Sequence, residues 1–169
     1  TDGGITESVL PFTEIVHPHD AESFIHIPSD VSHAAAKESL GGLKTSLAEL
    51  GLNISTGRVV DFRLKEALRK EPGRDTVPLL YPCHFNGGTV HWPKLEARKP
   101  NAILDNEETR PWLVPAGMYL LTKRFTSKEE RRRLVACLYD PDQVKADRVG
   151  FENHLNYFHA SGQGLERML

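Results

Sequence analysis

The stretch from residue 118 to residue 139 constrains the fold of this chain more than any other. Over 118–125 two sets of side chains alternate, one of Tyr119, Leu121, Lys123 and Phe125 and the other of Leu120, Thr122 and Arg124. A period of two is typical of a β-strand. A second apolar run follows at 133–139, after a polar stretch. We predict an antiparallel hairpin, with a helix that begins at a Thr126–Glu129 capping box as the alternative.

Short strands separated by turns are expected through most of the chain. Further strands are predicted at 58–63, 77–81, 89–92 and 153–158. Asn86-Gly87-Gly88 predicts a tight turn between apolar flanks. One helix is expected between Ser29 and Gly51, because leucines recur there at helical spacing and a glycine is suited to end it. These patterns indicate an α+β fold, with a mixed, mostly antiparallel β-sheet and a few helices.

The distribution of charge divides the chain. Residues 1–50 hold two Lys and eight Asp or Glu, residues 51–139 hold sixteen Lys or Arg and ten acids, and residues 140–169 hold three and five. A basic middle is compatible with a surface that binds a polyanion, although charges neutralised within the fold give the same composition. We expect a strand and helix segment, 1–50, that packs on a β-rich main domain, 51–169.

Length and apolar patterning exclude some classes of protein. With 169 residues the chain can form one domain with a core of its own. No apolar run approaches the roughly 20 residues that span a bilayer, so we expect no membrane partner. The two cysteines are Cys83 and Cys137. They are too few for a disulfide framework and suit the reducing cytoplasm.

The first candidate binding segment is Ser55-Thr56-Gly57-Arg58-Val59-Val60-Asp61-Phe62-Arg63. A glycine lets the backbone turn tightly or approach a ligand closely. The strand predicted after it would present Arg58, Asp61 and Arg63 from a fixed position, and such groups suit phosphates and base edges. An ordinary surface strand with salt bridges is the alternative.

A second candidate site spans the Asn-Gly-Gly turn. Tyr81, His84 and Trp92 are predicted to line a groove, and Lys94 to reach a phosphate from it. The alternative is that the aromatic side chains are half-buried core groups with hydrated tips.

A third candidate site is the connection of the predicted hairpin. Lys123, Arg124 and Lys128 belong to its basic cluster, which is either a phosphate clamp or a solvated tip. Asn153 lies in a later strand, where it could bond an adenine edge or tie down a loop.

The sequence carries no recognisable catalytic motif. It has no Gly-x-Gly-x-x-Gly, no nucleophile elbow, no His-Glu-x-x-His and no Asn-Pro-Pro-aromatic segment. Cys83 and His84 are adjacent, so on a strand they would point to opposite faces. His17 and His19 have a spacing that can hold a metal, but no cluster of further ligands follows them.

Several segments together resemble the adenine-specific DNA methyltransferases of type II restriction–modification systems, in the region downstream of their catalytic domain. The resemblance covers roughly residues 5–165, and its segments are Ser-Thr-Gly-Arg-Val-Val-Asp-Phe-Arg (55–63), Pro-Leu-Leu-Tyr-Pro-Cys-His-Phe (78–85), Lys-Pro-Asn-Ala-Ile (99–103), Tyr-Leu-Leu-Thr-Lys-Arg-Phe-Thr-Ser-Lys-Glu-Glu-Arg-Arg-Arg (119–133) and Phe-Glu-Asn-His-Leu-Asn-Tyr-Phe-His (151–159).

The resemblance implies a DNA target recognition domain. The catalytic domain, with its S-adenosylmethionine site and adenine pocket, is expected upstream, and this piece of a longer protein is expected to hold no cofactor and to be inactive alone. Double-stranded DNA and the upstream domain are the partners implied. Arg58, Asp61 and Arg63 would read base edges or nearby phosphates, and Lys94, Lys123, Arg124 and Lys128 would contact phosphates. A docking domain without DNA contact is the alternative function, and an unfamiliar enzyme that uses histidines is a third.

Overall fold

The computed structural model describes residues 7, 9–19, 23–25, 45–127, 129–130 and 132–165. The chain divides into two units, Thr1–Thr45 and Ser46–Leu169, and each is described by itself. In the first unit a short helix, α1 (Phe12–Ile15), precedes an antiparallel bridge between Val16 and Ile25. No helix among the described residues is long and apolar enough to cross a membrane.

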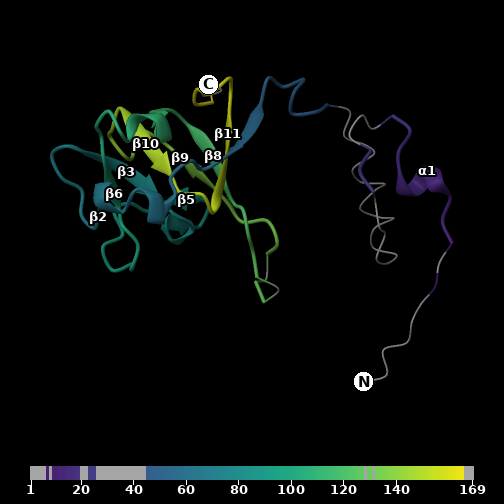
Figure 1. Cartoon of the computed structure of the whole chain (residues 1–169), viewed down its shortest axis with the longest axis horizontal. Coiled ribbons are helices and arrows are strands. Elements are labelled where there is room, and N and C mark those ends of the chain that lie inside the picture. Colours follow the sequence, from purple (N-terminus) through teal and green to yellow (C-terminus); the bar gives the residue numbers. More distant parts are fainter. Residues whose placement is uncertain are drawn as a thin grey trace. The chain divides into compact units, whose positions relative to one another are not determined.

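The larger sheet of the second unit has six strands (Figure 1). In spatial order they are β1 (Asn53–Thr56), β11 (Leu155–His159), β8 (Tyr119–Lys123), β9 (Ala136–Tyr139), β5 (Thr89–Val90) and β4 (Phe85–Asn86). Neighbouring strands are antiparallel except β5 and β9. The antiparallel pairing of β8 with β9 confirms the predicted hairpin, and its connection extends away from the sheets (Figure 1).

The smaller sheet has five strands. In spatial order they are β2 (Leu68–Arg69), β6 (Ala102–Leu104), β3 (Thr76–Leu80), β10 (Arg148–Phe151) and β7 (Val114–Pro115). The pair β3–β10 is parallel and the others are antiparallel. The described helices besides α1 are single 3₁₀ turns, η1 (Asp61–Arg63), η2 (Lys65–Ala67), η3 (Pro82–His84) and η4 (Arg110–Trp112). This architecture confirms an α+β fold with mixed, mostly antiparallel sheets and few helices.

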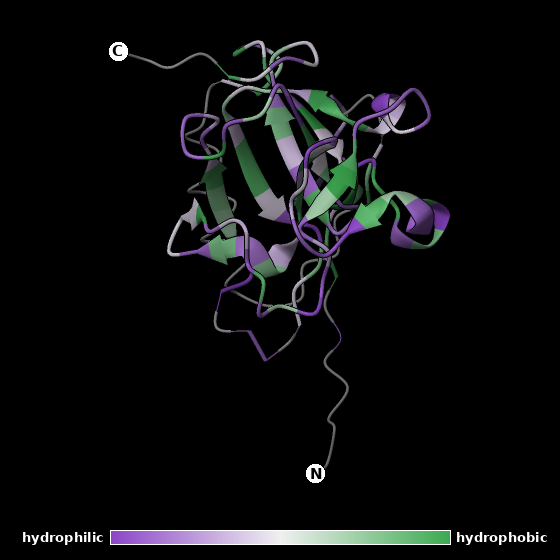
Figure 2. Ribbon diagram, turned by 90° about the vertical axis from the view of Figure 1, so that its left-hand side faces the viewer, coloured by the Kyte–Doolittle hydropathy of each residue, from purple (hydrophilic) through white to green (hydrophobic). Residues whose placement is uncertain are grey.

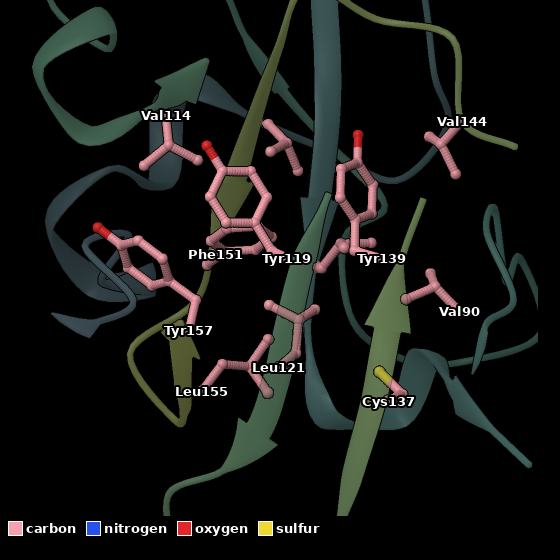
Figure 3. Packing of buried hydrophobic residues seen from close by; sticks show 12 residues of the cluster. Val90, Val114, Tyr119, Leu121, Cys137, Tyr139, Val144, Phe151, Leu155 and Tyr157 are labelled. Atoms are coloured by element: carbon pink, nitrogen blue, oxygen red, sulfur yellow. The ribbon is translucent and has the colours of Figure 1, made fainter. Parts of the chain in front are cut away.

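Aromatic side chains fill the space between the sheets. Tyr119, Phe151 and Tyr157 meet edge to face or tilted, with ring centroids 5.1–5.9 Å apart, and all three are almost fully buried (Figure 3). Such pairs contribute about 0.5–1.5 kcal/mol each beyond the burial of their area. Figure 2 shows hydrophobic residues concentrated on the strands and hydrophilic residues on many of the connections.

The prediction of a strand over 58–63 was wrong. Only Val59 pairs, through a parallel bridge to Glu152, and the chain then turns into η1. The reason is tertiary, because Val59 bonds to β10 and its following loop: its amide donates to the Phe151 carbonyl and its carbonyl accepts from Asn153. Arg58, Asp61 and Arg63 therefore do not share one strand.

The two glycine signals differ in their outcome. Gly87 and Gly88, at φ 58° and 95°, form the two-residue loop between β4 and β5, as predicted from their left-handed preference. Gly57 is needed for a different reason, because a Cβ placed on it would lie 2.1 Å from the Glu152 carbonyl oxygen. The absence of a side chain at Gly57 lets two backbone segments of this domain pack together.

The helix expected before Gly51 lies largely outside the described residues. Residues 47–50 form a turn in which the Leu50 amide donates to the Ser46 carbonyl. Gly51 follows in the left-handed region, at φ 68°, where glycine is favoured.

Candidate nucleic-acid interface

A pocket of about 390 Å³ opens where the loop after β3, the β8–β9 hairpin and the β10–β11 turn meet. Its lining residues are Tyr81, Pro82, Cys83, Lys99, Lys123, Phe125, Glu130, Glu152 and His154. Charged, aromatic and thiol groups from four parts of the sequence thus share one wall. Such a mixture suits a ligand that has both a flat apolar face and polar edges.

Asp61 stands behind the pocket and fixes two of its lining residues. The Tyr81 hydroxyl donates to Asp61 Oδ1 at 2.8 Å, and Lys99 Nζ donates to Asp61 Oδ2 at 2.8 Å. Lys99 also lies 5.0 Å from the centre of the Tyr81 ring. Burial and the Asp61 carboxylate raise the pKa of Tyr81, and the hydrogen bond to Asp61 raises the pKa of Lys99. Lys99 therefore keeps its positive charge at a fixed place, with its side chain about half exposed.

Glu152 and His154 form a carboxylate–imidazole pair on the turn between β10 and β11. The Glu152 carboxylate is buried, with 2% of the side chain exposed. Its Oε1 lies 2.6 Å from His154 Nδ1, and its Oε2 accepts from the His154 backbone amide at 3.0 Å. The His154 ring is more than half exposed. Because Glu152 occupies Nδ1, Nε2 is the ring nitrogen that remains for a ligand.

The rim of the pocket combines cations with an exposed aromatic ring. Lys123 pairs with Glu130 at 3.0 Å. The Arg124 guanidinium donates to the Asn153 carbonyl at 3.3 Å and lies 4.9 Å from the centre of the Phe125 ring. Phe125 is 62% exposed, and its ring meets the His154 ring edge to face. A cation, a phenyl ring and an imidazole side by side can contact a phosphate and stack on a base.

Two of the residues predicted from sequence, Tyr81 and Lys123, line the pocket, and Asp61 bonds to Tyr81 behind it. Arg124 follows Lys123 and donates to the backbone carbonyl of Asn153. His154, Glu152, Lys99 and Phe125 were not in the predicted set. The sequence held a signal for the first two, since Glu-x-His on a tight turn brings a carboxylate and an imidazole within reach of each other. Nothing local to Lys99 indicates its pairing with Asp61, which is 38 residues away.

His84, which was predicted to line a groove, is buried, and Lys94, which was predicted to reach a phosphate, bonds to the backbone beside it. His84 is 1% exposed; its Nδ1 accepts from the Tyr81 amide at 2.9 Å, so Nε2 donates to Asn101 Oδ1 at 3.0 Å. Lys94 Nζ donates to the Cys83 carbonyl, and Trp92 Nε1 donates to the Asn101 carbonyl. Burial lowers the pKa of His84, which is consistent with a neutral ring in this network.

Asn101 is the centre of this network and was not singled out from sequence. It is fully buried. Its side-chain oxygen accepts from the Lys94 amide at 2.6 Å as well as from His84, and its side-chain nitrogen donates to the carbonyls of Lys70 and Lys94. The network fixes the loop that carries Lys99, so it supports the pocket without lining it.

The segment before Val59 lies along β11. Ser55 Oγ and His159 Nε2 are 2.8 Å apart, and Thr56 donates to Asn156 at 3.1 Å. Arg58 is exposed and close enough to His159 for its charge to lower the pKa of that ring, after the larger effect of burial.

Arg63 is also exposed, with its guanidinium 5.7 Å from the centre of the Phe62 ring. Lys128 lies outside the described residues.

Cys83 contributes a thiol to the wall of the pocket. Burial raises the pKa of the Cys83 thiol, which disfavours the nucleophilic thiolate. Among the described residues, no group of three or more His, Cys, Asp or Glu could hold a metal ion.

Two curated proteins are similar to nearly the whole chain. The type II methyltransferase M.PstI of Providencia stuartii is 46% identical, and the type II methyltransferase M.BsuBI of Bacillus subtilis is 48% identical, each over 157 residues, or 93% of this chain. The chain spans only 31% of the length of either relative. Identity at this level establishes homology to a part of these methyltransferases. No protein-family model and no solved structure matches the chain.

Proposed function

We propose that this chain is the DNA target recognition part of a type II restriction–modification methyltransferase that modifies adenine. The observation that carries the proposal is the similarity of almost the whole chain to about a third (31%) of two type II methyltransferases. The remainder of the parent protein would bind S-adenosylmethionine and transfer the methyl group. The cationic and aromatic rim of the pocket supports a role in binding nucleic acid, and this part alone would be inactive.

The proposed division of labour follows from the chemistry of adenine. Its amino nitrogen is inaccessible to a cofactor inside a stacked duplex, so the base must be swung out, at a cost of a few kcal/mol. A second domain that grips the duplex offsets this cost. It also supplies the choice of sequence, which a pocket that accepts any adenine cannot provide.

Two kinds of contact are proposed. Lys123 and Arg124 contact phosphates, because they carry positive charge on the projecting hairpin. Arg63 and the pocket groups Lys99 and His154 meet base edges, with Asp61 holding Lys99 in place. Phosphate contacts set the register on the duplex, and base contacts set the sequence.

Titration of duplex DNA into this chain at several salt concentrations tests the proposal. Affinity should fall as salt rises, and Lys123→Ala should weaken binding to all sequences alike and reduce the salt slope by about one. Arg63→Ala should change the preference among sequences. Lys145→Ala is the matched control, because Lys145 is exposed and does not line the pocket. Salt-independent binding, or no binding, would refute phosphate contact and favour a docking role.

A further inference from the structure

The register of the larger sheet aligns four apolar side chains across four neighbouring strands. Ile54 on β1 pairs with Phe158 on β11, Phe158 with Leu120 on β8, and Leu120 with Leu138 on β9. The labelled strands β11, β8 and β9 lie side by side in Figure 1. We call this set the apolar row. With strands about 4.8 Å apart, it extends about 14 Å across the sheet.

The apolar row lies on the face of the sheet that turns away from the core. Residues that alternate with it, such as Tyr157, Leu121 and Cys137, are buried in the core (Figure 3), and successive side chains of a strand point to opposite faces. Ile54 is 49% exposed and Leu138 is 37% exposed, and Phe158 and Leu120 between them are half-buried. Lys123, which lines the pocket, alternates with Leu120 and Thr122 and so projects to the other face.

This face carries no charge on the four strands. Besides the apolar row, its positions hold Thr56, Asn156, Thr122 and Ala136. The solvated face of an antiparallel sheet normally holds polar and charged residues. Aligned apolar side chains without charges are typical of the centre of a protein–protein interface. They are unsuited to DNA, whose phosphates require cations.

We infer that the apolar row is the surface on which the rest of the parent methyltransferase docks. This inference rests on the proposed function. The relatives are about three times as long as the part that this chain matches, so the remainder of such a protein is large enough to cover this face. Docking on the uncharged face would leave the cationic pocket free for DNA. The apolar row also includes β1, which is the edge strand of the sheet and the first strand of the unit.

Labelling of single cysteines compares this chain with the full-length methyltransferase that contains it. Cysteines introduced one at a time, as Ile54→Cys or Leu138→Cys in a Cys83→Ser, Cys137→Ala background, should react with a maleimide at least tenfold more slowly in the full-length protein. Leu95→Cys is the control, because Leu95 is 47% exposed and lies outside the apolar row, so its rate should not change. Equal rates at positions 54 and 138 in the two proteins would overturn the inference.

Two further measurements identify the occupant. Protection that is already present in this chain and grows with its concentration would indicate a second copy, and it would also overturn the inference. Leu138→Lys should lower methylation by the full-length protein at least tenfold while this chain keeps its affinity for DNA. If Leu138→Lys lowers both the methylation by the full-length protein and the DNA affinity of this chain, the loss of methylation is not due to docking. Salt-dependent DNA binding tests the proposed function separately, since it can persist when cysteine protection is not found.

Discussion

Replacement of Gly57 by alanine distinguishes a structural glycine from one that makes room for DNA. An added Cβ would lie 2.1 Å from the Glu152 carbonyl oxygen and 2.6 Å from the Phe151 carbonyl oxygen. Both obstacles are backbone atoms, so no side-chain rotation can relieve the contact. The two segments must separate until the Cβ is at least 3.0 Å away.

The magnitude follows from what joins the segments. Gly57 donates to the Leu155 carbonyl at 2.7 Å, Val59 donates to Phe151 at 3.0 Å, and Asn153 donates to Val59 at 2.9 Å. A shift that breaks one or two of these bonds costs about 1 kcal/mol for each. Overpacking adds about 1–3 kcal/mol. We expect Gly57→Ala to lower the free energy of unfolding by about 3 kcal/mol and the Tm by about 10 °C.

Thermal unfolding of this chain, followed by circular dichroism, measures the effect. Gly73→Ala is the matched control, because a Cβ at Gly73 has its nearest neighbour at 4.0 Å. The control should leave the Tm unchanged or raise it slightly, since alanine restricts the unfolded chain. An unchanged Tm for Gly57→Ala, together with weaker DNA binding, would refute the structural reasoning and restore the interpretation that Gly57 makes room for a ligand.

Three other changes test the pocket and its support. Burial lowers the pKa of His84 below 6.5, so near this pH the unfolded chain binds more protons than the folded chain. The Tm should therefore fall as the pH drops from 7.5 to 5.5, and His84→Gln should make this fall smaller. Asn101→Ala leaves the His84 Nε2 donor and the Lys94 amide without their acceptor and should cost about 3 kcal/mol in urea unfolding; a cost below 1 kcal/mol would contradict its central role. Phe125→Ala removes a ring that is 62% exposed, so stability should stay within about 0.5 kcal/mol, whereas DNA affinity should fall about tenfold if a base stacks there.

The sequence determined the local elements wherever side chains act on their own backbone. The alternation of side chains over 118–125 predicted β8, and the two glycines after Asn86 predicted the β4–β5 loop. Both signals are local, because the two-residue period of a strand and the left-handed preference of glycine depend only on neighbouring residues. The fold class followed from the same patterns. Two of the thirteen predicted contact residues, Tyr81 and Lys123, line the pocket because they belong to segments that the fold brings together.

Only the tertiary structure decided which groups meet. The Asp61–Lys99 ion pair, the Asn101 network and the apolar row join residues that are far apart in the chain, and register and strand order, rather than any local signal, bring them together. Tertiary contacts also explain why residues 58–63 do not form a strand and why His84 is buried. A glycine can be read from the sequence, but whether its missing side chain admits a ligand or another strand depends on what the fold places opposite it.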